Sequence, residues 1–463
     1  MNTFALAWRN LLRARRRSIT TLLAMIVGAN AVLLFGGYSR NITYGLQSDY
    51  VKYGGHLQIQ RQGYYLYGSG NPAAYGIASY QKIIDTIKAD PVLQPMVVMA
   101  TPTLDLQGIA GNFSAGVSRT ALGVGVVVAD QNVMRAWNDY DFPVEIPPMA
   151  LTGTPADAAI VGVSLARVLQ LCKPLQIKDC PEPPSPPSRP GARELSVDVA
   201  ALGALAGQDG LAAPFANSIE MLAATARGAP NVAQLKVVKA EEQGVKEFDD
   251  VYVGLHLAQA QRLVFGNDPP KATAIVVQLQ HTGQMKAARE RLEFLLRTSF
   301  AGESTEVVDY TTLNPFYGQA LALFGTIFGF VAALIGAIVL FTVGNTMSMA
   351  VIERTVEIGT LRAMGLRRSH LRRLFMSEGL LLGAAGAVIG VGIAAGIAGL
   401  INFSGLTWTP PGRSPVPLII RVWGEPKLIA GTTAGLVLVA ILSAWLPSRR
   451  AARLDIVEAL RHV

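Results

Sequence analysis

Residues 318–347 read GQALALFGTIFGFVAALIGAIVLFTVGNTM, a stretch without a single Asp, Glu, Lys or Arg. Because a helix rises about 1.5 Å per residue, about 20 apolar residues cross the hydrocarbon core of a bilayer. The stretch is the centre of a longer charge-free run, Tyr310–Ile352, in which Asn314-Pro315 marks the expected start of the span. The sequence therefore predicts a membrane-spanning helix here.

Three further charge-free runs have the same character: Ser18–Ser39, Gly379–Gly412 and Leu428–Ser448. The composition agrees, since 51% hydrophobic and 16% charged residues with a mean hydropathy of +0.34 are too apolar for a soluble chain of 463 residues. We expect a membrane α-helical protein with four transmembrane helices. Their predicted bounds are 18–39, 316–349, 373–402 and 427–447.

The net charge of +8 would raise nucleic acid as a partner if it were spread over the chain. It is not, because residues 1–17, 353–378 and 449–461 together hold 15 basic and 5 acidic residues, whereas the rest holds 25 and 27. Lys and Arg near the ends of spans stay on the cytoplasmic side. We therefore expect both termini inside, one large domain outside, and no nucleic acid. The expected non-spanning segments are a cytoplasmic lead at 1–17, an outside domain at 40–315, a cytoplasmic loop at 350–372, a short outside loop at 403–426 and a cytoplasmic tail at 448–463.

A cleavable signal peptide is the alternative for the first run, because basic residues precede it and Ala29-Asn30-Ala31 could be cleaved. The apolar run is longer than a typical signal core and continues through Val32–Phe35. This length favours a spanning helix.

The outside domain has a mixed α/β pattern. Its start reads as strand, helix and strand at Gly55–Gln60, Gln81–Asp90 and Val97–Leu106. Its end repeats that order at Ala272–Gln280, Gln284–Arg297 and Glu306–Tyr310. We expect an α+β domain with a split α/β core, interrupted by an inserted lobe at about 172–235.

The lobe contains six prolines between Pro181 and Pro190, which predict an exposed extended loop. Cys172 and Cys180 flank its entrance. A disulfide in an oxidising compartment and two free thiols both stay open. Two cysteines and five scattered histidines offer no metal-ligand spacing, so no metal site is expected.

Several kinds of chemistry find no support in the sequence. It has no G-x-x-x-x-G-K-[ST] loop to cradle ATP. Gly162–Ala166 resembles a nucleophile elbow but lacks the final glycine, so we expect a structural turn there. No acidic residue lies in mid-span, which disfavours an ion-coupled carrier. We expect a subunit that is not an enzyme.

The loop between the second and third spans carries the most specific pattern. Arg354–Gly365 reads RTVEIGTLRAMG and forms a short amphipathic segment that Gly365 is placed to end. It resembles the R-x-x-E-I-G-x-L-R-A-x-G coupling-helix pattern of ABC-transporter permeases of the MacB, LolC/LolE and FtsX class. Trp8–Ser18, Glu378-Gly379 and Pro447–Arg461 also resemble that class, although Ile456 stands where the class usually has proline. A solvated loop on anionic headgroups is the alternative reading of the segment.

The resemblance implies a mechanism. In this class two permeases pair, each binds one copy of a separate ATPase through its coupling helix, and ATP-driven closure is passed to the outside domain. ATP and Mg would then be bound in the partner ATPase, with no cofactor on this chain. The implied location is the bacterial inner membrane, and the pair would be a homodimer or a related heterodimer. The implied coupling residues are Glu353, Arg354, Glu357, Ile358, Gly359, Leu361, Arg362, Ala363, Met364 and Gly365, with Glu357, Gly359 and Arg362 central.

Four small-x-x-x-small pairs in the spans would let helices approach closely. They are Gly325/Gly329, Gly379/Gly383, Gly386/Gly390 and Gly392/Gly396. Packing within one subunit and packing between subunits both stay open for each pair.

The resemblance leaves three functions. Lipoprotein or lipid-like substrate extraction and release is favoured by the segment Gly55–Gln58, which resembles the start of the outside domain in LolC and LolE. MacB-like export of amphipathic small molecules or peptides, through an adaptor, is the alternative. FtsX-like signalling to a cell-wall hydrolase is the third, and its outside domains are smaller. The partners would be a second permease and an adaptor or lipoprotein carrier.

Overall fold

The computed structural model describes residues 3–142, 147–177, 180, 217–243, 246–408 and 416–454. The chain divides into two compact units, which are described separately. One, the helical unit, comprises Met1–Leu46, Phe316–Pro410 and Ser414–Val463; the other, the α+β unit, comprises Gln47–Pro315. The predicted proline-rich loop and the end of the tail, with Ile456, lie outside the described residues.

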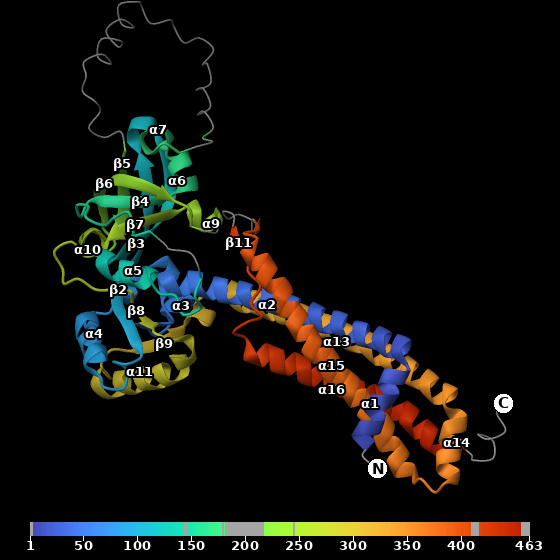
Figure 1. Ribbon diagram of the computed structural model, residues 1–463. Coiled ribbons are helices and arrows are strands. Elements are labelled where there is room, and N and C mark those ends of the chain that lie inside the picture. Colours follow the sequence, from blue (N-terminus) through green and yellow to red (C-terminus); the bar gives the residue numbers. More distant parts are fainter. Residues whose placement is uncertain are drawn as a thin grey trace, which may run out of the picture. The chain divides into compact units, whose positions relative to one another are not determined.

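Four long helices dominate the helical unit (Figure 1). They are α2 (Arg15–Gly54), α13 (Pro315–Glu353), α15 (Arg368–Phe403) and α16 (Pro426–Arg453). Each is long and apolar enough to cross a membrane. The shorter elements are α1 (Thr3–Arg13), α14 (Thr355–Ala363), β10 (Thr407–Trp408) and β11 (Val416–Pro417). The protein is therefore a membrane protein by the length and composition of these helices.

The helices extend beyond the predicted spans. α2 has 40 residues, so at about 1.5 Å each it is about twice as long as the hydrocarbon core is thick. It continues past Ser39 through the polar residues up to Gly54, and α13 continues to Glu353. Apolar composition marks only the part of a helix that can cross lipid, whereas the backbone hydrogen bonds that define the helix continue beyond that part.

A shared apolar core joins the four long helices. Met25 and Ala29 of α2 pack with Val339 and Val343 of α13, and with residues of α15 and α16 such as Ala440. These side chains are small or flexible, which lets the helix backbones approach closely.

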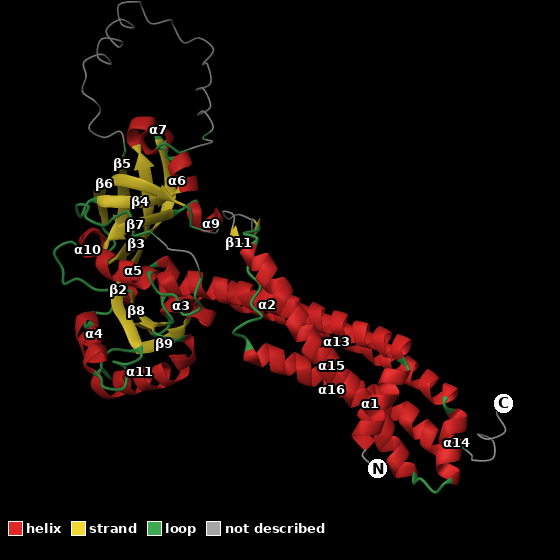
Figure 2. Ribbon diagram, viewed as in Figure 1, coloured by secondary structure: helices red, strands yellow, loops and turns green. Residues whose placement is uncertain are grey.

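The α+β unit is built on one sheet, drawn in yellow in Figure 2. Its strands are β1 (Leu57–Arg61), β2 (Val97–Asn112), β3 (Val117–Val126), β4 (Ala158–Gly162), β5 (Ser218–Ala224), β6 (Pro230–Glu241), β7 (Tyr252–His256), β8 (Ala274–Leu279) and β9 (Thr305–Asp309). Its helices are α3 (Tyr64–Tyr67), α4 (Tyr80–Ala89), α5 (Val128–Arg135), α6 (Val163–Val168), α7 (Cys172–Leu175), α9 (Lys246–Asp249), α10 (Leu257–Phe265), α11 (Met285–Ser299) and α12 (Tyr310–Leu313). Short 3₁₀ turns lie at Gly68–Gly70, Pro72–Tyr75, Phe113–Ala115 and Thr282–Gln284.

The two ends of this unit form the predicted split α/β core. In the order β2-β8-β1-β9, all neighbouring strands are antiparallel. Helix α4 lies between β1 and β2 in the chain, and α11 between β8 and β9, which is a split β-α-β arrangement. Ile83, Ile84 and Ile87 of α4 and Leu292 and Leu296 of α11 are buried in one core, as their helical spacing predicts.

The inserted lobe is larger than the predicted one at 172–235. Strand β2 continues beyond the core sheet and pairs with β3 on one side and β5 on the other. The ladders β3–β7, β7–β4, β4–β6 and β6–β5 complete a ring that returns to β2. The insertion is therefore a closed barrel of six described strands, and β5 and β6, which were expected in a separate lobe, are part of it. Closure pairs both edges of each of these strands.

Candidate functional site: the coupling segment

The predicted coupling segment is a separate short helix. α13 ends at Glu353, Arg354 leaves helical geometry with φ −107°, and α14 runs from Thr355 to Ala363. Gly365 then has φ +91°, a conformation that favours glycine. Its N–H bonds the Arg362 carbonyl at 3.0 Å, and the Leu366 N–H bonds the Leu361 carbonyl at 3.1 Å. These two bonds form a Schellman cap, which ends α14 where the sequence predicts.

One side of α14 is packed into the helical unit. Ile358 is buried in a cluster with Leu371 and Phe375 of α15 and Ala451 of α16, and Gly359 is buried beside it. These residues hold α14 against the ends of the long helices. Gly359, which the pattern places at the centre of ATPase contact, is therefore inside this chain.

The other side of α14 is exposed. Among the predicted coupling residues, Glu353, Glu357, Ala363, Met364 and Gly365 are exposed, whereas Arg354, Leu361 and Arg362 are half-buried. Val356 and Met364 are large apolar side chains with exposed fractions of 47% and 71%. Val356 and Thr360 belong to this exposed face but were not among the predicted site residues, because only the buried partners of Ile358 reveal which side of the helix is free.

Arg362 also turns inward. Its guanidinium donates a hydrogen bond to the carbonyl of Leu454, at the end of the described part of the tail. The arginine thus joins α14 to the segment that follows α16. This contact indicates that Arg362 helps to position α14.

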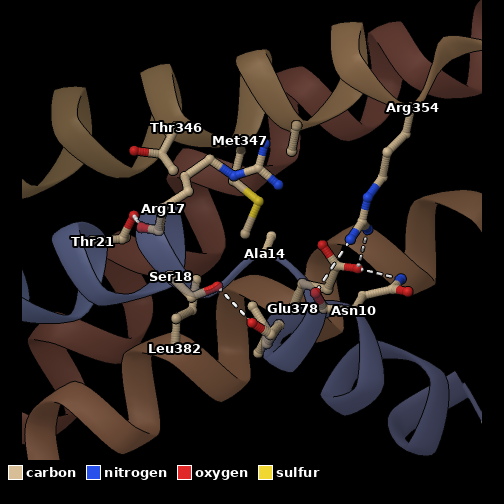
Figure 3. A pocket seen from close by; sticks show the side chains of 12 residues that line it. Asn10, Ala14, Arg17, Ser18, Thr21, Thr346, Met347, Arg354, Glu378 and Leu382 are labelled. Atoms are coloured by element: carbon tan, nitrogen blue, oxygen red, sulfur yellow. Dashed lines mark hydrogen bonds and ion pairs between the residues drawn. The ribbon is translucent and has the colours of Figure 1, made fainter.

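A buried carboxylate on α15 joins α1 to the junction between α13 and α14. The Asn10 side-chain amide donates to Glu378 Oε1 at 2.7 Å, and Arg354 Nη1 donates to the same oxygen at 3.3 Å. Arg354 Nη2 also donates to the Asn10 carbonyl at 3.2 Å. Glu378 is only 3% exposed. Figure 3 shows its carboxylate between Asn10 of α1 and Arg354.

These three residues line one side of a small pocket within the helical unit. The remaining lining residues are Leu11, Ala14, Arg17, Ser18, Thr21, Thr346, Met347, Ala350 and Leu382 (Figure 3). The lining comes from α1, α2, α13 and α15, the elements that surround the entrance to the coupling segment. A change in the position of α14 would therefore be felt at this cluster through Arg354.

Two ion pairs connect the N-terminal region to the same segment. Arg17 lies 2.5 Å from Glu353, and Arg13 lies 3.4 Å from Glu357. The second pair is the weaker, because its side chains are 80% and 56% exposed and the charges are screened by water. Glu357 is therefore held only loosely by its own chain.

The predicted glycine pairs separate into two groups. A Cβ on Gly379 would lie 2.8 Å from Ala444 Cβ, and one on Gly383 would lie 3.0 Å from Ala440 Cβ, both on α16. Cβ atoms on Gly386 and Gly390 would lie 2.7 Å and 2.4 Å from Met25 Cβ and Ala29 Cβ of α2.

These four glycines pack helices within one subunit, since only a hydrogen fits at each contact. At the remaining predicted glycines, the position that a Cβ would take has no neighbouring atom of the described residues within 4 Å: Gly325, Gly329, Gly392 and Gly396.

In the α+β unit, a disulfide joins Cys172 and Cys180, whose Cα atoms are 6.2 Å apart. It closes the chain around α7. The state of these two residues in the cell stays a prediction.

A buried histidine ties β1 to β8 in the same unit. The Leu279 N–H donates to His56 Nδ1 at 3.0 Å, so the proton of the neutral ring is on Nε2, 3.2 Å from Thr282 Oγ1. The ring meets Trp137 edge-on at 5.1 Å between centroids. Burial lowers the pKa of His56 to about 4, although the negative charge of Asp139 acts in the opposite direction and raises it.

Ser164 has a structural environment. The Asp249 carboxylate accepts the N–H of Val163 at 3.0 Å and the N–H of Ser164 at 2.7 Å. These bonds satisfy the first turn of α6. The predicted structural turn at Gly162–Ala166 is thus a helix start capped by Asp249.

Comparison with known proteins agrees with this geometry. Residues 326–456, which contain the coupling segment, match the family of the FtsX-like permease C-terminal domain. The chain is 28% identical over 236 residues to the uncharacterized ABC transporter permease MJ1507 of Methanocaldococcus jannaschii, covering 49% of this chain and 55% of that protein. It is 36% identical over 152 residues to the ABC transporter permease YtrF of Bacillus subtilis, covering 30% and 32%.

A third relative is the pyoverdine export ATP-binding/permease protein PvdT of Pseudomonas savastanoi pv. phaseolicola, 29% identical over 230 residues, which cover 48% of this chain and 32% of PvdT. The chain spans about half or less of the length of these relatives. The matched region covers α15, α16 and most of α13, three of the four candidate spans, together with the short helix α14 between α13 and α15. Residues 326–456 thus match the FtsX-like permease family, and the chain is similar to proteins named ABC transporter permeases.

Proposed function

We propose that this chain is the transmembrane subunit of an ATP-driven transporter and that α14 receives the motion of a separate ATPase subunit. The observation that carries the proposal is the two-sided environment of α14. Ile358 and Gly359 are fixed in the helical unit, while Val356, Glu357 and Met364 present an exposed face to a partner. ATP and Mg would be bound by the ATPase, and closure would reach the α+β unit through α2 and α13.

The proposed assembly has two permeases and two ATPase copies in a bacterial inner membrane. The arginine-rich segments, including α1 and the α14 region, would face the cytoplasm, and the α+β unit would face the periplasm. The glycines without a neighbour among the described residues, Gly325, Gly329, Gly392 and Gly396, are the available sites for close contact with a second permease, identical or related.

Lipoprotein or lipid-like extraction is the first substrate proposal, supported by the resemblance of Gly55–Gln58 to LolC and LolE. Export of a small amphipathic molecule is the second, supported by the similarity to PvdT. Photocrosslinking from the α+β unit in cells would separate them, since acylated lipoprotein and periplasmic adaptor give products of different mass.

Charge reversal at Glu357 tests the coupling role. When the permease is reconstituted in proteoliposomes with its partner ATPase, Glu357→Lys should insert and fold normally. The complex should lose most of its substrate-stimulated ATP hydrolysis. Arg13→Gln breaks the same ion pair while keeping Glu357, and Asp85→Lys makes the same charge change on the exposed side of α4. Both controls should stay coupled. Normal transport by Glu357→Lys would refute docking through this face.

A further inference from the structure

The N-terminal helix α1 has two faces with different environments. Ala7 is fully buried and Leu11 packs against the common core of the long helices. Phe4, Trp8 and Leu12 lie on another face, with exposed fractions of 52%, 54% and 51%. Residues four apart lie on one side of a helix, so these three side chains form a continuous apolar stripe. The described residues of the helical unit leave this stripe uncovered.

Near this stripe in the sequence lie two arginines, Arg9 and Arg16, that no acidic residue of the described ranges neutralises. The first 17 residues contain five arginines and no acidic residue. Arg13 and Arg17 pair with Glu357 and Glu353. Arg9 and Arg16 are exposed, and neither forms an ion pair with another residue in the described ranges. An anion outside this chain is the natural complement for them.

The stripe is continued along the chain by a membrane-facing surface. Ile19, Leu23 and Val27 recur at the same four-residue spacing on α2 and are about half to two-thirds exposed. α2 is one of the candidate spans, so these exposed apolar side chains would face lipid tails. α1 would then lie just before the chain enters the hydrocarbon, in the zone where Trp side chains are enriched and arginines meet headgroups.

From these contacts we propose that Phe4, Trp8 and Leu12, with Arg9 and Arg16, form a binding surface for anionic phospholipid headgroups. The apolar side chains insert at the headgroup boundary and the two guanidiniums bind phosphate. Lipid matches both features, because its headgroups supply anions for Arg9 and Arg16 and its acyl boundary takes up the apolar side chains. We therefore expect α1 to bind lipid rather than a second copy of the protein.

The same helix holds the coupling segment. The Asn10 side chain of α1 donates to Glu378, and the Asn10 carbonyl accepts a hydrogen bond from Arg354. Fixing α1 on anionic lipid therefore fixes the entrance of α14. The consequence for ATP hydrolysis rests on the proposed function, whereas the lipid surface itself does not.

Photoactivatable lipids test the surface on the full-length protein. The protein is placed in nanodiscs of phosphatidylcholine with a minority of phosphatidylglycerol, and a headgroup-proximal probe is carried by one lipid or the other. Mass spectrometry of the crosslinked peptides should show a several-fold preference for phosphatidylglycerol within residues 3–17. The preference should fall with rising salt, since exposed charges are screened.

The variant Arg9→Gln/Arg16→Gln should lower the phosphatidylglycerol yield on the order of 25-fold, because each of the two basic residues near an anionic surface contributes about fivefold. Trp8→Ala should lower the yields of both lipids. Arg367→Gln/Arg368→Gln removes the same charge from exposed positions at the start of α15 and should leave the preference unchanged.

Equal crosslinking by the two lipids, or crosslinks from residues 3–17 to a second permease or the ATPase, would overturn the proposal. ATP hydrolysis of the assembled complex, measured in the same nanodiscs, gives a separate result. If the protein prefers phosphatidylglycerol but ATP hydrolysis does not depend on the lipid, the binding surface is supported and only its effect on α14 is refuted. Loss of hydrolysis in every lipid would count against the proposed function instead.

Discussion

The buried carboxylate of Glu378 is held inside the helical unit by hydrogen bonds from Asn10 and Arg354. The Glu378 side chain is 4% exposed and that of Arg354 is 14% exposed. Removing one partner of such a buried pair leaves the other charge uncompensated, whereas replacing both can cost little. The cluster is therefore sensitive to any change that separates α1 from the α13–α14 junction.

We predict that Glu378→Ala destabilises the protein by about 3 kcal/mol. Glu353→Ala breaks the more exposed pair with Arg17 and should cost less than about 1 kcal/mol. Graded unfolding by SDS in mixed micelles measures both changes. Equal effects of the two substitutions would show that burial of the Glu378 pair does not govern its contribution.

His56 makes a second residue-scale prediction, on pH. Its pKa in the folded protein is about 4, below the value of about 6.5 expected for the unfolded chain. The unfolded state therefore binds more protons between these values. The contribution of His56 is complete above about pH 6.5 and is lost as the pH falls towards 4, by up to about 3 kcal/mol.

Hydrogen exchange of the β1 and β8 amides from pH 7 to pH 4.5 measures this loss. His56→Gln keeps an acceptor for the Leu279 N–H but cannot titrate, so its acid sensitivity should be smaller. An unchanged pH profile in that variant would assign the acid sensitivity to other groups.

At the scale of elements, sequence periodicity predicted the helices and their buried faces wherever the local pattern alone determines which side is buried. The four apolar runs predicted the spans, and the isoleucines of α4 predicted its buried face. The barrel escaped prediction because its closure depends on β2 pairing with both β3 and β5, and no local pattern encodes that distant ladder. The exposed side of α14 escaped for the same reason, since Leu371 and Phe375 decide what is covered.

The glycine contacts give an element-scale prediction. A methyl group at Gly390 would meet Ala29 Cβ at 2.4 Å, so Gly390→Ala must push α15 and α2 apart. Overpacking of this kind costs about 1–3 kcal/mol. Gly392→Ala, two positions along the same helix, meets no neighbouring atom of the described residues and should be neutral or slightly stabilising through helix propensity.

Thermal unfolding of the purified variants in detergent compares the two substitutions. A loss of stability at Gly392→Ala that disappears when the proposed dimer is dissociated would place this glycine in contact with a second permease. Equal stability of Gly390→Ala and the unmodified protein would show that α2 and α15 are more loosely packed than their contact distances imply.

For the whole molecule, the uneven distribution of charge sets the expected orientation. The segments that hold α1, the α14 region and the tail carry a net charge of +10, and the remainder carries −2. Basic residues resist translocation, so the charged face should stay in the cytoplasm with both termini. The α+β unit would then lie in the oxidising compartment, where the Cys172–Cys180 bond is stable.

Single cysteines test this orientation in a Cys172→Ser/Cys180→Ser background, in which no other thiol competes. Phe294→Cys on α11 and Met364→Cys after α14 both replace exposed side chains, with exposed fractions of 54% and 71%. A membrane-impermeant maleimide added to intact spheroplasts should label Phe294→Cys and leave Met364→Cys unmodified until the membrane is opened. Because the two positions are comparably exposed, the reverse pattern would mean that the arginines lie outside, and docking of a cytoplasmic ATPase on α14 would then be impossible.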